Sequence, residues 1–161
     1  MNNIYIRRAE LEDISTIAKL AEKIWKEYYP SVISYAQIEY MLFKMYSPDS
    51  LYRQIEQLSH QYFLMYADDQ ATGYYSVEPR PGECFIHKFY IDASIHGKGI
   101  GSILMEHLLT THTCDSYLLQ VNRKNIKAIN FYFRHGFRIK KWEDIDIGGG
   151  FYMEDFIMER K

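Results

Sequence analysis

Apolar residues in the first third of the chain recur at the spacing of helices. Between residues 11 and 25 they fall at positions 11, 14, 17, 18, 21, 24 and 25, which is one face of a 3.6-residue period. Ser34 with Gln37 three residues later has the pattern of a capping box and predicts a second helix to about residue 45. Ser47 before Pro48 predicts the start of a third helix, which ends near residue 58. A short strand at 4–7 is expected before these three helices.

The pattern changes after residue 60 to apolar and aromatic runs that are typical of buried strands. Runs at 61–67 and 71–77 flank Asp68-Asp69-Gln70 and predict a hairpin. Pro79, Pro81 and Gly82 are expected to break the chain after this hairpin. The remaining predicted elements are a strand at 84–92, a helix at 100–111, a strand at 117–121, a helix at 125–135 that stops at Gly136, and strands at 137–147 and 151–158 around Gly148-Gly149-Gly150.

The order of these elements, β-ααα-βββ-α-β-α-ββ, predicts the fold class. The strand–helix–strand unit at 84–121 implies two parallel strands with a right-handed crossover. The hairpins on either side imply antiparallel pairing, so we expect a mixed, mostly antiparallel sheet flanked by helices, of the α/β (α+β) class. The chain has 161 residues without a repeat or a linker, which favours a single domain over residues 1–161.

Composition and charge exclude several classes of function. The 19 Lys and Arg residues nearly balance the 21 Asp and Glu residues, whereas binding of nucleic acid needs a basic surface. No apolar run approaches the roughly 20 residues of a membrane span, and the first residues turn charged too early for a secretory signal. Cys84 and Cys114 lack the spacing of a zinc site, so we expect reduced thiols, a cytoplasmic protein and no metal.

Three glycines between a predicted strand and a predicted helix give the first indication of chemistry. Gly97, Gly99 and Gly101 follow the strand directly, and the helix at 100–111 begins among them. Glycines let backbone N–H groups approach a ligand, and a helix start adds unpaired N–H groups with a partial positive charge. The combination predicts a pyrophosphate-binding loop. Lys98 lies between glycines rather than after the last one, unlike in a P-loop, and the glycine spacing differs from the dinucleotide-binding fingerprint.

Two motifs resemble those of the GCN5-related N-acetyltransferases. The segment His96-Gly97-Lys98-Gly99-Ile100-Gly101 resembles the pyrophosphate loop Q/R-x-x-G-x-G/A of that family, with His96 where Gln or Arg is usual. Residues 122–137 resemble the family's N-x-x-N-x-x-A-x-x-x-Y-x-x-x-G-F stretch position for position. The order of the elements is also similar to that of the family over essentially the whole chain.

The resemblance implies an enzyme that transfers the acetyl group of acetyl-CoA directly to an amine, in a gap where the strands at 84–92 and 116–121 splay apart. It implies that Tyr132 protonates the CoA thiolate, and a phenol suits this role because it keeps its proton at neutral pH. A backbone N–H near residues 89–91 would stabilise the oxyanion. The residues implied to bind the cofactor are Phe89, Tyr90, Ile91, His96, Gly97, Lys98, Gly99, Ile100, Gly101, Ser102, Asn122, Asn125 and Tyr132.

Several of the implied site residues also have an ordinary structural interpretation. Asn125 lies where the N-cap of a helix would, which does not exclude contact with the pantetheine arm. His87 is the candidate general base because a histidine accepts a proton near neutral pH, while a packed strand histidine and a base acting through water remain open. Tyr28 and Tyr29 are expected to wall the acceptor site, whereas Trp25 is expected to belong to the core.

The identity of the acceptor stays open at this level. Residues 59–64, 86–91 and 151–153 resemble the bacterial spermidine/spermine acetyltransferases of the same superfamily, which implies a small amine or a polyamine. The alternatives are a protein N-terminus or lysine as acceptor and a non-catalytic acyl-CoA-binding module, and the chain is expected to be a monomer or a homodimer. Four carboxylates in segments expected near the acceptor would attract a cation or else form a solvated surface: Glu27, Glu83, Asp144 and Asp146.

Overall fold

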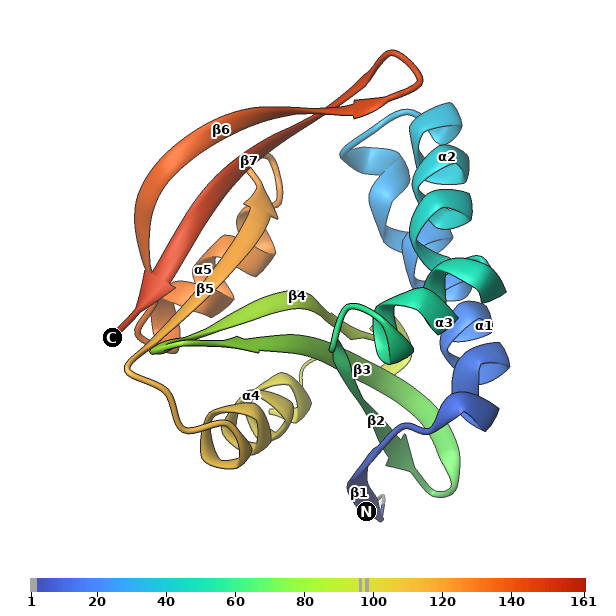
Figure 1. The fold of residues 1–161 in the computed structure, drawn as a ribbon, viewed down its shortest axis with the longest axis vertical. Coiled ribbons are helices and arrows are strands. Elements are labelled where there is room, and N and C mark those ends of the chain that lie inside the picture. Colours follow the sequence, from blue (N-terminus) through green and yellow to red (C-terminus); the bar gives the residue numbers. More distant parts are fainter. Residues whose placement is uncertain (1–2, 96, 98) are drawn as a thin grey trace.

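The computed structural model describes residues 3–95, 97 and 99–161, in which a seven-stranded sheet carries helices on both faces (Figure 1). The strand order is β1-β2-β3-β4-β5-β7-β6, and all neighbours are antiparallel except β4 and β5. This arrangement confirms the expected α/β class and mixed, mostly antiparallel sheet. The strands are β1 (Ile4–Arg8), β2 (Gln61–Ala67), β3 (Gln70–Arg80), β4 (Glu83–Ile91), β5 (Ser116–Asn122), β6 (Arg138–Gly148) and β7 (Phe151–Arg160). The helices are α1 (Ile14–Tyr28), α2 (Tyr35–Tyr46), α3 (Pro48–Glu56), α4 (Ile100–Thr111) and α5 (Ile126–Arg134).

Two hydrophobic cores form on opposite faces of the sheet, because side chains alternate along each strand. In β2, Phe63 and Met65 face the core shared with α4 and α5. Tyr62 and Leu64 face the core shared with α1, α2 and α3, which also contains Trp25 as expected. Among the described residues, no helix has the length and apolar character needed to span a membrane.

β4 and β5 pair with each other over only part of their length. Glu83–Ile86 of β4 matches Ser116–Leu119 of β5 in register. Beyond these residues β4 continues to Ile91 and β5 to Asn122 without pairing to each other. The sheet therefore opens into two wings, β1-β2-β3-β4 and β5-β7-β6 (Figure 1), and the gap that the sequence predicts between the two strands is present.

A bulge in β4 changes which side chains face each core. The register of β3 against β4 skips one residue, His87, at the point where the two wings begin to separate. Ile86 faces the core under α4 and α5, and so does Phe89, three residues later. Lys88 and Tyr90 lie on the opposite face, against the core under α1, α2 and α3. The extra residue thus shifts the alternation of β4 by one position.

Two of the predicted helix starts are confirmed by their hydrogen bonds. Ser34 Oγ accepts a hydrogen bond from the Gln37 N–H at 3.1 Å, and Ser47 Oγ accepts one from the Ser50 N–H at 3.3 Å. The reciprocal bond of the expected capping box is not formed, because the Gln37 side chain instead donates to the Tyr152 carbonyl at 2.8 Å.

The expected chain break at Pro79 is wrong. β3 runs through Pro79 to Arg80, and Pro79 lies opposite Cys84 of β4. β2 begins at Gln61, opposite Val77, so β3 has a strand neighbour on one side only beyond this point. A proline lacks an N–H group, and such an edge tolerates it.

Candidate active site

A cavity of about 630 Å³ lies where β4 and β5 separate. Its walls come from α1, α2, β4, the start of α4, β5, α5 and β7, and its volume is typical of a small-molecule site. His96 and Lys98 lie outside the described residues. The other residues predicted to bind the cofactor, to act in catalysis or to wall the acceptor site with aromatic rings line this cavity: Tyr28, Tyr29, His87, Phe89, Tyr90, Ile91, Gly97, Gly99, Ile100, Gly101, Ser102, Asn122, Asn125 and Tyr132.

The glycine loop has the backbone shape that a close ligand contact requires. Gly97 has φ +86° and Gly99 has φ +69°, a left-handed region that glycine adopts without steric cost, and Gly99 is the N-cap of α4. A Cβ atom on Gly101 would lie 2.9 Å from Phe131 Cε2, so glycine here also lets α4 start close to α5. The first N–H groups of a helix have no partner within it and carry partial positive charge. These residues fit the pyrophosphate of a nucleotide cofactor.

The two asparagines of the second motif both make hydrogen bonds within the chain. Asn125 Oδ1 accepts the Ala128 N–H at 3.2 Å, which confirms its place as the N-cap of α5. The same oxygen accepts the Tyr28 hydroxyl at 2.6 Å. Asn122 Oδ1 accepts the Lys124 N–H at 2.9 Å in the turn before the helix. Contact of either asparagine with the pantetheine arm stays a prediction.

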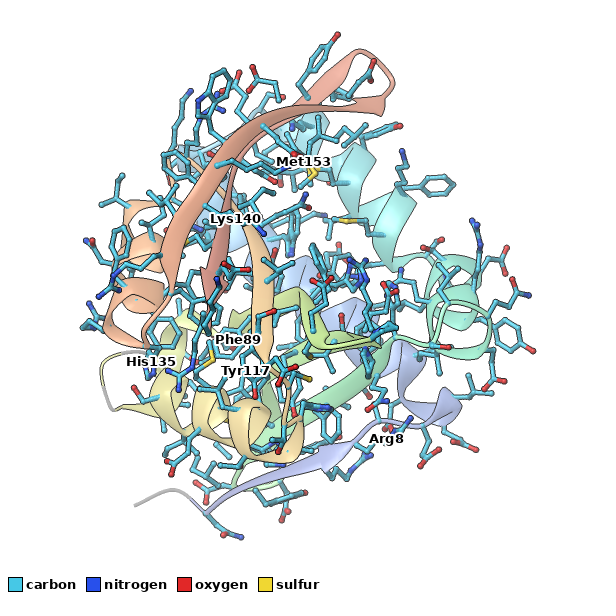
Figure 2. The ribbon with its side chains drawn as sticks, turned by 60° about the vertical axis from the view of Figure 1, so that its left-hand side comes forward. Arg8, Phe89, Tyr117, His135, Lys140 and Met153 are labelled. Atoms are coloured by element: carbon cyan, nitrogen blue, oxygen red, sulfur yellow. The ribbon has the colours of Figure 1, made fainter. Side chains whose placement is uncertain are left out.

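Tyr132 lies on the second turn of α5 and lines the cavity. Its ring contacts Phe89, which Figure 2 shows near the middle of the molecule, with 6.3 Å between ring centroids. It also packs edge-on against Phe137 at 5.7 Å. Burial raises the pKa of Tyr132 well above its ordinary value. The hydroxyl therefore keeps its proton through the neutral range, as a general acid must.

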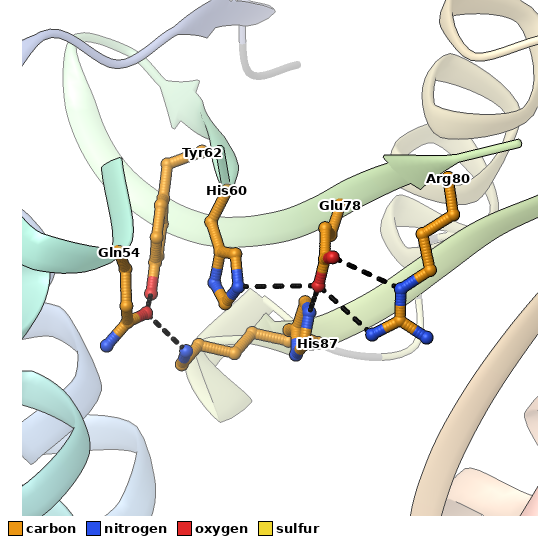
Figure 3. Close-up of polar contacts among 7 residues, drawn as sticks. Gln54, His60, Tyr62, Glu78, Arg80 and His87 are labelled. Carbon is orange, nitrogen blue, oxygen red and sulfur yellow. Dashed lines mark hydrogen bonds and ion pairs between the residues drawn. The ribbon is translucent and has the colours of Figure 1, made fainter. Parts of the chain in front are cut away.

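His87 lies at the bulge of β4, and Glu78 of β3 holds its ring in place (Figure 3). His87 Nε2 is 2.8 Å from Glu78 Oε1. Arg80 donates to both oxygens of this carboxylate, at 3.1 and 3.2 Å, and lowers the pKa of Glu78 to about 2. An ionised carboxylate only accepts, so Nε2 carries the proton and Nδ1 keeps its lone pair. Burial lowers the pKa of His87, which leaves the ring neutral at pH 7.

His60 completes the cluster around Glu78. Its ring stacks on that of His87 with 3.9 Å between centroids, and its Nε2 is 3.7 Å from Glu78 Oε1. Burial lowers the pKa of His60 to about 4. The ligand atoms of His60, Glu78 and His87 lie within 4.8 Å of one another, and these residue types bind zinc. The guanidinium of Arg80 on the shared carboxylate opposes a further cation there, so we assign no metal to the cluster.

Lys88 is a buried lysine that sequence analysis did not single out. It lies on β4, lines the cavity, and donates a 2.8 Å hydrogen bond to Gln54 Oε1 (Figure 3). Its ammonium lies 5.4 Å from the ring centroids of both Tyr46 and Tyr62. Burial lowers the pKa of Lys88 to about 7, so part of the population is uncharged at neutral pH. The bulge at His87 turns the Lys88 side chain toward the face of the sheet that α1, α2 and α3 cover. The sequence alone does not reveal this bulge.

The part of the cavity wall that comes from α1, α2 and β7, here called the α1–α2–β7 wall, is rich in aromatic rings. Tyr29 stacks on Trp25 with 4.4 Å between ring centroids, and Tyr28 packs edge-on against Tyr29 at 5.5 Å. Trp25 is 2% exposed, as expected for a core residue, although one edge reaches the cavity. The two tyrosines expected to wall the acceptor site thus lie together on this wall.

The four carboxylates expected near the acceptor do not line the cavity. Asp144 forms an ion pair with Arg123 at 2.8 Å, away from the cavity lining. The carboxylate that does line the cavity is Asp155 of β7, which is 2% exposed. Asp155 lies two residues before the buried Ile157, and residues two apart in a strand face the same side of the sheet. This spacing is the signal in the sequence for a carboxylate on the buried face.

The turn between β6 and β7 packs against α2, next to the α1–α2–β7 wall (Figure 1). The Tyr40 hydroxyl donates to the Ile147 carbonyl at 2.7 Å, and Gln37 Nε2 donates to the Tyr152 carbonyl at 2.8 Å. A Cβ atom on Gly149 would lie 2.8 Å from the Tyr40 ring, so the glycine turn permits this close approach. The hairpin is therefore bonded to α2 on both of its arms.

Comparison with known protein families matches residues 18–137 to the acetyltransferase (GNAT) family. The chain belongs to the GNAT acetyltransferases. It is an N-acetyltransferase that uses acetyl-CoA, which confirms the class of enzyme and the cofactor that the sequence implies. The matched region includes both the glycine loop and the motif at 122–137.

This GNAT enzyme is similar to several characterised proteins. The spermidine N(1)-acetyltransferase of Thermoplasma acidophilum is 26% identical over 166 residues, which cover 99% of this chain and 98% of the relative. The spermine/spermidine N(1)-acetyltransferase of Bacillus subtilis is 30% identical over 79 residues, or 47% of this chain and 51% of the relative. The peptidyl-lysine N-acetyltransferase YjaB of Salmonella typhimurium is 35% identical over 57 residues, or 35% of this chain and 38% of the relative.

A solved structure shows the same fold with the cofactor. The crystal structure of the PaiA N-acetyltransferase from Thermoplasma acidophilum in complex with coenzyme A has a TM-score of 0.80 to this GNAT enzyme at 26% identity. The similarity covers 99% of both chains.

Proposed function

We propose that this GNAT enzyme acetylates a small amine, with polyamines as the acceptor class. The observation that carries the proposal is the hairpin between β6 and β7, which is bonded to α2 beside the acceptor side of the cavity. An extended peptide needs an open groove along its length, whereas a short flexible amine can enter an aromatic pocket from one end. The relative that matches over the full chain is named as a spermidine acetyltransferase, which supports the same class.

The glycine loop and the first turn of α4 would bind the pyrophosphate of acetyl-CoA. The backbone edges of β4 and β5 that face the gap would bind the pantetheine arm, because each strand lacks a neighbour there. Acetyl-CoA supplies an activated acetyl thioester when it is bound. Phe89, Tyr90 and Ile91 follow the bulge along this edge, so their N–H groups are the ones expected to stabilise the oxyanion.

Two side chains on the cavity wall would move the protons. His87 Nδ1 accepts a proton from the acceptor's ammonium, and Glu78 stabilises the charged ring through Nε2. The Tyr132 hydroxyl gives its proton to the departing sulfur. The chain thus offers a base and an acid on separate walls of one cavity, Tyr132 on α5 and His87 on β4. Each such group typically contributes 10²–10⁴-fold to the rate.

The experiment that tests the proposal is a thiol-release assay with acetyl-CoA and a panel of acceptors. The panel contains polyamines, monoamines, peptides with free N-termini and lysine peptides, at fixed salt. We expect the highest kcat/KM for a polyamine. A peptide that outperforms every small amine would favour the protein-acetylating alternative, and acetyl-CoA binding without thiol release for any acceptor would favour a non-catalytic module.

A further inference from the structure

Asp155 is a buried carboxylate with one oxygen that has no hydrogen-bond partner among the described residues. It is 2% exposed, and its Oδ2 accepts no hydrogen bond from the described residues. Buried carboxylates are normally paired or hydrogen-bonded, because an unpaired buried charge is costly. Burial raises the pKa of Asp155 to about 6, so the carboxylate is mostly ionised at pH 7. Because Asp155 lines the cavity and its Oδ2 has no partner among the described residues, this oxygen is available to a ligand.

The surroundings of Asp155 suit a cation. It lines the same cavity as Tyr28 and Tyr29, and aromatic faces favour an ammonium group. The charged groups that act on it are Arg123, which follows β5 and lowers its pKa, and Glu143 of β6, which raises it. Arg123 already forms an ion pair with Asp144 at 2.8 Å.

Asp155 and His87 lie at different depths along the gap. His87 follows Ile86, which is paired with Leu119 of β5, whereas Asp155 is paired with Asn122. Those two β5 positions are three residues apart, which is about 10 Å of strand at roughly 3.3 Å per residue. Lys88 adds positive charge next to His87 and disfavours a second cation at that end. Among the described residues that line the cavity, Asp155 is therefore the carboxylate that can serve as counter-charge for a cationic group remote from the reacting amine.

We infer that Asp155 binds a second ammonium group of the acceptor, distal to the amine that is acetylated. The inference rests on the proposed function and narrows it to acceptors with two or more amines. Asp155 then determines specificity without taking part in the proton transfers. The separation of the two sites also implies a preferred distance between the two nitrogen atoms of the acceptor.

The test compares unbranched diamines of increasing length, each against the monoamine of the same carbon chain. In the wild type we expect kcat/KM to be higher for diamines and to peak at one chain length. Asp155→Asn should lower kcat/KM for the best diamine at least about tenfold, with less than about a threefold change for its monoamine, because only the diamine loses a charge-assisted bond. Asp155→Glu keeps the charge and should keep a preference for diamines.

Glu154→Gln is the matched control, because Glu154 is the neighbouring carboxylate on the exposed face of β7. It should leave the diamine preference and the Kd for acetyl-CoA unchanged. Arg123 Nη1 also lacks a partner, so an internal ion pair with Asp155 is the competing interpretation. That interpretation predicts a lower Tm for Asp155→Asn without acceptor, whereas a ligand-binding carboxylate predicts an equal or higher Tm.

The outcomes separate this inference from the proposed function. Equal losses for monoamines and diamines, no loss at all, or a lower Tm with unchanged specificity would each overturn the role of Asp155 while the small-amine function stands. Calorimetry with spermidine gives a second readout without turnover, and we expect Asp155→Asn to weaken this binding by the same factor. A wild type that acetylates only peptides would instead overturn the proposed function.

Discussion

The hydroxyl of Tyr28 donates a 2.6 Å hydrogen bond to Asn125 Oδ1, and this bond ties the end of α1 to the start of α5. The same oxygen accepts the Ala128 N–H and caps α5. Since Tyr132 lies further along α5, the bond sets the helix that carries the proposed acid against the α1–α2–β7 wall. One side-chain oxygen thus serves both the local helix and the relative position of two cavity walls.

Replacing Asn125 by alanine should therefore cost more than a helix cap alone. We expect Asn125→Ala to lower the free energy of unfolding by about 1–2 kcal/mol, because it removes the cap and leaves the Tyr28 hydroxyl without its partner. Urea unfolding measures this change. Tyr28→Phe keeps the cap and should cost about 1 kcal/mol or less. Equal losses in the two variants would mean that the cap contributes nothing.

Tyr132→Phe removes one hydroxyl and keeps the ring contacts with Phe89 and Phe137. We expect kcat to fall by about 10²-fold, because the departing sulfur loses its proton donor. The Kd for acetyl-CoA, measured by calorimetry, should change little. Full turnover in this variant would show that the thiolate leaves without this acid.

Gly99→Ala tests the glycine loop against a control with the same backbone conformation. Apart from its chain neighbours, no atom of the described residues lies within 4 Å of a Cβ built at Gly99, so a methyl group there would project from the loop expected to bind the pyrophosphate. We expect the Kd for acetyl-CoA to rise about tenfold, equivalent to about 1.4 kcal/mol. Gly150 also has a positive φ, +81°, and an open Cβ position, but it does not line the cavity.

Gly150→Ala should lower the free energy of unfolding by about 1–2 kcal/mol, as Gly99→Ala does, because alanine disfavours the left-handed conformation. It should leave the Kd for acetyl-CoA unchanged. If both variants weaken binding equally, strain in the chain rather than the loop surface explains the effect.

The pH dependence of kcat/KM should report His87 as the base. Burial lowers the pKa of His87, and the hydrogen bond from its ring to Glu78 raises it in part. A base must be neutral, so kcat/KM should fall as the pH drops through a value below 6.5, the ordinary pKa of histidine. Glu78→Gln removes the charge that favours the protonated ring and should move this midpoint to lower pH.

Lys88 is the group that could imitate this titration, because its own pKa is about 7. Lys88→Met should therefore keep an acid limb, while His87→Gln should abolish it. A midpoint that disappears in Lys88→Met and persists in His87→Gln would assign the base role to the lysine.

Local signals in the sequence predicted most of the fold. Ser34, Ser47 and Asn125 cap helices because their side chains bond N–H groups only three residues away, and such bonds depend little on the rest of the chain. The parallel unit formed by β4, α4 and β5 follows from the order of the elements. Pro79 was misjudged because its tolerance depends on where β2 begins, which no local pattern reveals.

The candidate site was most predictable where a motif spans consecutive residues. The glycine loop and the segment from Asn122 to Phe137 satisfy this condition. Glu78 and His60 are brought to His87 by strand register and by the turn before β2, which are long-range properties of the sheet. Asp155 comes from β7, opposite the end of β5, and the four carboxylates favoured in the sequence lie elsewhere.

The bulge at His87 determines which face of the sheet each later side chain of β4 occupies. If His87 were paired in the β3–β4 ladder without the bulge, Phe89 and Ile91 would turn toward α1 and α2, and Lys88 and Tyr90 would enter the core under α4 and α5. A buried ammonium would then lie in the hydrophobic core under α4 and α5, and Phe89 would lose its contact with Tyr132. The bulge thus absorbs the one extra residue of β4 and keeps Phe89 and Ile91 on one face of the sheet and Lys88 and Tyr90 on the other.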